Sequence, residues 1–180
     1  MRITLFVISL FLLLNPAFPQ ETRYQTYKAQ LKINANKDGE IYKWENKNIT
    51  VTLDYRTGEF LLKLKNTDFQ QTEGNSTATP DDEKQQIEYQ FKGILPVNDI
   101  LHQKSITTTY PVELQLSCDE LDINQTLNFQ MEVTRPGSGS GGYRIFSLNG
   151  KLYNDELNIP AFDGFDNEVD LWIVFNAFSN

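Results

Sequence analysis

The stretch YPVELQLSCDELDINQTLNFQMEV, which runs from Tyr110 to Val133, decides the fold class. From Tyr110 to Leu116, and again from Leu127 to Val133, apolar residues alternate with mostly polar ones. Successive side chains of a β-strand point to opposite faces of a sheet, so this pattern predicts two half-buried strands. Together they predict a hairpin, whose apolar face is turned either toward a packed core or toward a cavity.

The same alternation recurs along the chain, and long helical patterns do not, so the sequence predicts an all-β protein. Residues 48–66 hold two such runs around a Thr-Gly turn and predict a second hairpin. Within EVDLWIVFNAF at 168–178, the apolar run 171–175 predicts a strand buried on both faces or shifting face at a bulge. About eight strands result. Their length, and the lack of paired cysteines, favour a closed antiparallel barrel over an immunoglobulin-type sandwich.

Three stretches depart from this pattern. QQTEGNSTATPDDEKQQ at 70–86 has one alanine and no larger apolar side chain, which predicts an exposed loop. RPGSGSGG at 135–142 is rich in glycine, whose backbone loses much entropy on ordering, and it predicts a loop between two strands. NDILHQKS at 98–105 has no sustained period and predicts irregular structure.

Residues 1–20 predict a secretory signal peptide. Arg2 precedes an unbroken apolar run from Ile3 to Leu14, which is shorter than the roughly 20 residues that cross a bilayer. Cys118 is the only cysteine, so a lipid-anchored cysteine at the cleavage site is excluded. The expected mature protein, residues 21–180, is one β-barrel domain that is periplasmic or secreted and not integral to the membrane.

Composition excludes several partners and sites. Removing the leader takes away one basic residue and no acid, so the net charge changes from −8 to −9, which disfavours nucleic acid and anionic membranes. His102 is the only histidine, and no nucleophile, zinc-helix or phosphate-loop motif is present. Cys118 lies near Asp119 and Glu120, which raise the pKa of a thiol, so a structural thiol is predicted. We expect no cofactor, no metal and no catalytic residue.

One segment near the C-terminus is acidic and rich in turn-forming residues. DGFDNEVD at 163–170 gathers four acids in a turn-rich stretch, but their spacing differs from that of an EF-hand calcium loop. A solvated acidic loop is therefore the favoured interpretation, and a weak calcium site is the alternative.

Three motifs in the second half of the chain resemble those of a known family. YQFKGIL at 89–95 resembles an F-x-G-x-I strand, and YPVELQLSCDELDINQT at 110–126 resembles a Y-x-V-x-x-x-G-x-L-x-I-x-G-x-T hairpin. FSLNGKLYNDELNIP at 146–160 is similar to a late strand in which an acid precedes an I-x-I-P-like end. In the order and spacing of these motifs, residues 86–179 resemble the YceI-like family. The family's hairpin glycine is replaced around Ser117, and its H-F-N-like and S-x-x-Y-P stretches are absent.

The resemblance implies a single eight-stranded, lipocalin-like antiparallel barrel and an exported carrier without catalytic activity. Its ligand would be a long-chain apolar lipid: a polyisoprenoid, a quinone or a fatty-acyl chain. Affinity would come from removing apolar ligand surface from water, and specificity from a few polar groups at the mouth. The residues expected to line the barrel, chosen by strand phase, are Ile49, Val51, Leu53, Phe60, Leu62, Tyr89, Phe91, Tyr110, Val112, Leu114, Phe129 and Met131.

Two other functions stay open on the sequence alone. Aromatic residues in the apolar phase, with Phe146 and Trp172 among them, fill a barrel as readily as they line one, because period two does not report the volume left between them. A closed-core exported barrel would act through its surface as an envelope-interaction, adhesion or inhibitor module. A small hydrolase with paired carboxylates is the third hypothesis, disfavoured because one small domain offers no long cleft.

Overall fold

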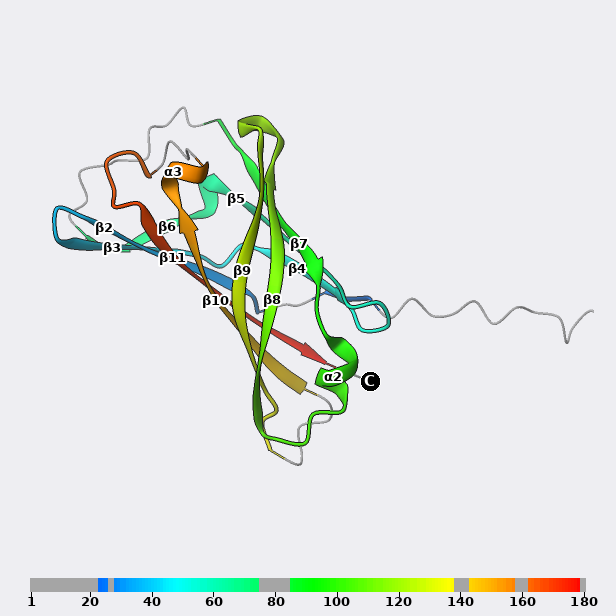
Figure 1. Ribbon diagram of the computed structural model, residues 1–180. Coiled ribbons are helices and arrows are strands. Elements are labelled where there is room, and N and C mark those ends of the chain that lie inside the picture. The colour runs from blue at the N-terminus through cyan, green and yellow to red at the C-terminus, as the bar shows by residue number, and fades with distance from the viewer. Residues whose placement is uncertain (1–22, 26–27, 75–84, 138–142, 158–161, 179–180) are drawn as a thin grey trace, which may run out of the picture.

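The computed structural model of the chain describes residues 23–25, 28–74, 85–137, 143–157 and 162–178, so the predicted signal peptide lies outside the described residues. Most of the described residues belong to one antiparallel sheet that curls around its own apolar face (Figure 1). The strands are β1 (Arg23–Gln25), β2 (Gln30–Lys37), β3 (Glu40–Asn46), β4 (Thr50–Asp54), β5 (Glu59–Lys65), β6 (Gln70–Glu73), β7 (Glu88–Ile94), β8 (Thr107–Cys118), β9 (Ile123–Thr134), β10 (Tyr143–Tyr153) and β11 (Glu168–Phe178). The helices are η1 (Asn66–Asp68), α2 (Val97–Leu101), η2 (Asp119–Leu121) and α3 (Asn154–Leu157).

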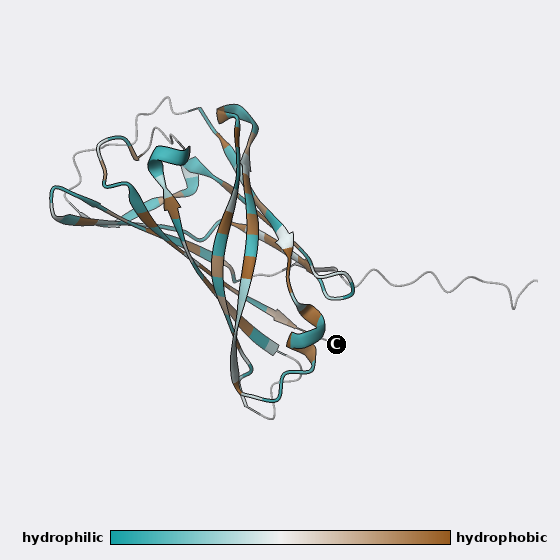
Figure 2. Ribbon diagram, viewed as in Figure 1, coloured by the Kyte–Doolittle hydropathy of each residue, from teal (hydrophilic) through white to brown (hydrophobic). Residues whose placement is uncertain are grey.

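The eleven described strands form one sheet in the order β1-β4-β5-β7-β8-β9-β10-β11-β2-β3-β6. All ten neighbouring pairs are antiparallel. Figure 2 shows hydrophobic and hydrophilic residues alternating along the strands, as expected for a sheet with one buried face. The all-β, antiparallel prediction is therefore confirmed.

The hairpin predicted from 110–133 is confirmed as β8 and β9. Tyr110 pairs with Met131 and Leu114 with Leu127, so both apolar sets point to the same face. The chain turns through η2 and Asp122, which adopts a left-handed conformation with φ of 53°. Asp adopts the left-handed conformation more readily than most residues do, so the turn between β8 and β9 needs no glycine.

The prediction of eight strands closed into a barrel is not confirmed, because two long stretches are each divided into two strands. Asn46 is the last residue of β3, and its buried side chain accepts a hydrogen bond from the Asn48 backbone N–H (2.8 Å) and donates one to the Lys65 carbonyl (3.2 Å). These bonds satisfy backbone groups where the strand bends. In the same way, η1 divides the second stretch into β5 and β6. The two halves pair separately: β4 pairs with β5, and β3 pairs with β6.

Three local predictions were wrong. Part of the stretch expected to be irregular is α2, whose Val97 and Ile100 are buried. The expected loop 70–86 begins with β6, and its residues 75–84 lie outside the described part of the chain, as do 138–142 of the glycine-rich loop. β11 is neither bulged nor buried on both faces: its ladder with β10 has no register shift.

The two ends of the sheet differ, and we name them after the helices beside them. At the α2 end lie the last residues of β7, β9 and β11 and the first of β8 and β10, and the η2 end is opposite. At the α2 end Leu95, Val97 and Ile100 are buried. The buried Gln103 amide donates to three backbone carbonyls, including that of Val133 on β9 (3.1 Å). The chain thereby seals the α2 end with its own side chains.

Candidate functional site

The sequence-predicted lining residues come together on the concave face of the sheet. Ten of them are buried members of one hydrophobic core, whereas the side chains of Tyr89 and Tyr110 are partly buried against it. The ten buried residues are Ile49, Val51, Leu53, Phe60, Leu62, Phe91, Val112, Leu114, Phe129 and Met131. Strand phase therefore identified the concave face, and the binding role of these residues stays a prediction.

Aromatic rings fill this face toward the α2 end. Phe175 on β11 stacks on Phe146 with ring centroids 4.6 Å apart, and it lies 5.5 Å from the ring of Phe60. All three side chains are buried. Because these residues lie near the α2-end termini of β5, β10 and β11, they form an aromatic floor beside the sealed end.

Two glycines let the middle of the concave face pack closely. A Cβ atom on Gly150 would lie 2.5 Å from the ring of Phe129, so this ring lies across the β10 backbone. A Cβ on Gly93 would lie 2.6 Å from Leu114 Cδ2 and equally close to the Glu113 carbonyl oxygen. Absence of a side chain at both positions gives room to large neighbours.

The η2 end is covered more loosely than the α2 end. Seven partly buried apolar side chains pack against the core, and six of them lie at this end: Trp44, Phe69, Ile87, Tyr89, Leu121 and Phe165. Phe165 contacts Tyr42 edge-on, with centroids 5.2 Å apart, and Trp44, 5.6 Å away. These rings rest on the core and stay partly exposed, and we refer to this end as the mouth of the concave face.

Tyr89 and Cys118 are two groups at the η2 end whose pKa values are raised. Burial raises the pKa of Tyr89 from 10.0 to about 12, with further contributions from Cys118 and Glu120. Burial is also the largest cause of the raised pKa of the Cys118 thiol, which lies 3.6 Å from a carboxylate oxygen of Glu120. A buried thiol with a raised pKa is consistent with the predicted structural role of Cys118. Burial, however, raises this pKa more than the neighbouring acids do.

These pKa shifts predict an alkaline loss of stability. Because the folded-state pKa values of Tyr89 and Cys118 are raised, the protonated groups stabilise the fold below their unfolded pKa values. We expect the free energy of unfolding to fall as the pH rises from about 9 to 12. Tyr89→Phe should make this decline shallower, whereas Tyr153→Phe, at an exposed site, should not. Urea unfolding across this pH range measures it; identical slopes for Tyr89→Phe and the parent protein would refute it.

Trp172 was predicted to face the interior with the other apolar residues of its strand, and this prediction was wrong. Its side chain lies on the outer face of β11, where Nε1 donates to Ser147 Oγ (2.6 Å) and the Lys32 ammonium lies 4.8 Å from the ring centroid. Because residues 171–175 are all apolar, the sequence does not show which of them face the interior. Leu171, Ile173 and Phe175 are buried on the inner face, whereas Trp172 and Val174 are half-buried on the outer face.

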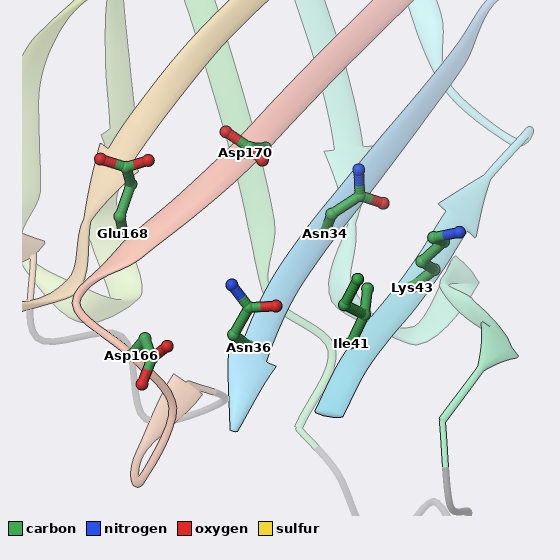
Figure 3. A pocket seen from close by; sticks show the side chains of 7 residues that line it. All are labelled: Asn34, Asn36, Ile41, Lys43, Asp166, Glu168 and Asp170. Carbon is green, nitrogen blue, oxygen red and sulfur yellow. The ribbon is translucent and has the colours of Figure 1, made fainter. Parts of the chain in front are cut away.

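A polar depression lies on the outer face of β11, β2 and β3 (Figure 3). Its volume is about 240 Å³, and it is lined by Asn34, Asn36, Ile41, Lys43, Asp166, Glu168 and Asp170. Lys151 pairs with Glu168, and Lys43 pairs with Glu73 at 2.6 Å. With three carboxylates, two amides and an ammonium among its lining groups, this depression does not suit an apolar chain.

Within the described part of the chain, no group of three or more His, Cys, Asp or Glu side chains is placed to hold a metal ion. Nor does any helix within it have the length and apolar character needed to cross a bilayer.

Sequence reasoning missed the aromatic residues at the mouth. Tyr42 and Trp44 alternate within EIYKWEN, so strand phase was a usable signal for β3. Phe165 lies in the turn-rich acidic segment before β11, where no periodicity points to a buried face.

Comparison with solved structures identifies the fold of the chain. No family model and no curated protein matches the sequence. The structure is similar to that of a polyisoprenoid-binding domain from Saccharophagus degradans implicated in plant cell wall breakdown, with a TM-score of 0.63, 10% identity, and 86% of this chain and 96% of that one covered. It is also similar to Burkholderia cenocepacia BcnA, with a TM-score of 0.55, 11% identity, and coverage of 83% and 96%. Both are YceI-like proteins.

The chain has the YceI-like fold. The predicted resemblance to the YceI-like family is thereby confirmed at the level of fold. The structural similarity covers most of the chain, whereas the three sequence motifs lie in its second half.

Proposed function

We propose that this protein is an exported carrier that encloses one long apolar lipid chain, such as a polyisoprenoid, a quinone or a fatty-acyl chain. The observation that carries the proposal is the continuous apolar concave face, formed in a fold shared with a polyisoprenoid-binding domain. Export rests on the predicted signal peptide of residues 1–20. No catalytic step is part of the proposal.

The proposal includes closure of the sheet into an eight-stranded barrel. The stretches 40–54 and 59–73 pair with each other through β3 with β6 and β4 with β5. On their outer sides, β3 pairs with β2 and β5 with β7. Counted as two bent strands, they complete a ring of eight with the remaining long strands. An interior of this size holds packed side chains or one small ligand.

The lipid chain would enter at the η2 end and end against the aromatic floor. The α2 end is closed by buried side chains, whereas partly exposed apolar groups cover the η2 end. Movement of these groups would admit a chain past Tyr89 toward Phe91 and Phe129. Burial of roughly 300 Å² of apolar ligand surface contributes about 7 kcal/mol, from which the ordering of ligand and protein must be subtracted.

Titration of the delipidated protein with a fluorescent fatty-acid analogue tests this proposal. We expect saturable binding, and a roughly tenfold loss of affinity in Leu121→Arg, which places a charge at the mouth. The matched control is Ile94→Arg, at an exposed apolar position of the α2 end, which should bind as the parent protein does. No saturable binding by the parent protein, or equal losses in both variants, would contradict the proposal.

A second candidate function is a closed-core barrel that acts through its surface. The observation that favours it is the mutual packing of Phe60, Phe146 and Phe175, which leaves the floor region filled by side chains. Absence of saturable probe binding would support this candidate over the carrier.

A further inference from the structure

A segment outside the sheet contributes two aromatic rings to the mouth. Residues 162–167 belong to the loop that leads into β11 (Figure 1). Phe162 is buried and Phe165 is partly buried, whereas the other four residues of the segment are exposed. Both rings pack edge-on against Trp44, with centroids 6.1 Å and 5.6 Å from that of the indole. Two aromatic side chains thus attach an otherwise exposed segment to the mouth.

The residues that these rings contact belong to the concave face. Trp44 on β3 pairs with the buried Ile33 of β2. Tyr42, whose ring centroid lies 5.2 Å from that of Phe165, pairs with the buried Ala35. Residues directly opposite each other in a sheet point to the same face, so Trp44 and Tyr42 point inward. Phe165 therefore covers the β2–β3 part of the concave face at the mouth.

The two ends of the 162–167 segment are held differently. At one end, the Phe162 ring is buried and its carbonyl accepts a hydrogen bond from Asn154 Nδ2 (3.1 Å). Beyond Phe165, the Asp166 N–H donates to the Asn36 carbonyl of β2 (2.8 Å). Asp166 and Asn36 are both exposed, so water can replace this bond. Local opening costs least where hydrogen bonds are exposed and few apolar groups are buried, which describes the Phe165 end.

Other partly buried groups of the mouth are tied more firmly to the sheet. Trp44 and Tyr89 lie on β3 and β7, whose backbones take part in the ladder. Leu121 lies in η2, the short turn that joins β8 to β9. Moving any of these three requires a change in the sheet or its hairpin, whereas moving Phe165 does not.

We infer that Phe165 is the gate of the mouth. To admit a lipid chain, the Phe165 end of the 162–167 segment swings away from β3 and breaks the hydrogen bond between Asp166 and Asn36. It closes again over the bound chain. This inference rests on the proposed carrier function and adds the moving part to it. A ligand that enters only while such a gate is open binds more slowly than one that enters an open cavity.

A disulfide that holds the gate shut tests the inference. Asn36 and Asp166 share a backbone hydrogen bond and line the same outer depression (Figure 3), so cysteines at both positions are within disulfide reach. Cys118 is buried and does not compete for them. The delipidated variant Asn36→Cys with Asp166→Cys is mixed with the fluorescent fatty-acid analogue in a stopped-flow instrument. We expect uptake to be roughly tenfold slower in the oxidised form than in the reduced form.

The matched control is Asn34→Cys with Lys43→Cys. These two residues line the same depression and lie opposite each other on β2 and β3, which the ladder already joins. Oxidation of this variant should therefore leave the rate of uptake unchanged.

Phe165→Ala is the second variant. Removal of the ring should speed both uptake and release of the probe by roughly tenfold, because the gate no longer closes. Ile41→Ala, at an exposed position on the outer face of β3, should leave both rates unchanged. Equal uptake by the oxidised and reduced forms of the gate disulfide variant, or unchanged rates in Phe165→Ala, would overturn the gate and leave the carrier function standing. No saturable binding by the parent protein would instead remove the carrier function, and the gate with it.

Discussion

Replacing Phe175 by alanine is expected to lower the free energy of unfolding by about 3–5 kcal/mol. The Phe175 ring is fully buried and lies between two other rings, stacked on Phe146 and 5.5 Å from Phe60. Its removal takes away apolar burial and leaves a space that the β-ladder on either side prevents from collapsing. Urea unfolding, monitored by tryptophan fluorescence, gives the free energy directly.

Phe178→Ala on the same strand is the matched control. Phe178 is exposed and contacts only the ring of Tyr143 among the described aromatic side chains, at 5.2 Å, so a change below about 1 kcal/mol is expected. A loss below about 1 kcal/mol for Phe175→Ala as well would mean that the aromatic floor is not packed as described.

Replacing Gly93 by alanine is expected to destabilise the protein by about 1–3 kcal/mol, although alanine normally improves a strand. The new Cβ would lie 2.6 Å from the Glu113 backbone oxygen, which cannot move without shifting β8. It would also lie 2.6 Å from Leu114 Cδ2. Valine at this position should have a larger effect, because it adds two methyl groups to the same contact.

Lys92→Ala, on the outer face of the same strand, is the comparison for Gly93→Ala. Lys92 is exposed, so its replacement should change stability by less than about 0.5 kcal/mol. Thermal unfolding midpoints of the two variants, measured together, separate the effect of the close contact from any general effect on β7. A stabilised Gly93→Ala variant would show that β7 and β8 are farther apart than the structure places them.

The hairpin of β8 and β9 was predictable because its alternation is long and uninterrupted. Seven residues of each strand, 110–116 and 127–133, alternate with period two, and a one-residue slip would expose every buried side chain from Val112 to Met131. The predicted concave face follows from the same rule, which explains why all twelve candidate residues lie on it.

Elements set by tertiary contacts were not predictable from periodicity. α2 has only five residues and is held by the burial of Val97 and Ile100, too short for a helical period to appear in the sequence. The break between β3 and β4 depends on two hydrogen bonds of the Asn46 side chain, one accepted from the nearby Asn48 N–H and one donated to the distant Lys65 carbonyl. Trp172 was misplaced because the outer face of β11 is itself half-buried.

The sequence predicts where the candidate site lies, but not how much space its side chains leave. Phase identifies which side chains face inward, but Gly93 and Gly150 show that the space between them depends on close contacts across strands. The aromatic groups of the mouth come from β3 and from the segment before β11, which meet only in the folded chain.

Mass spectrometry of an organic extract tests the central claim most directly. The protein would be purified without detergent from cells that express the full sequence, then extracted beside a parallel preparation of Leu121→Arg. The account predicts a long-chain apolar lipid, a polyisoprenoid, quinone or fatty-acyl species, near one per protein molecule in the parent preparation and less in the variant. Repeated extracts of the parent protein that contain no such lipid would contradict it.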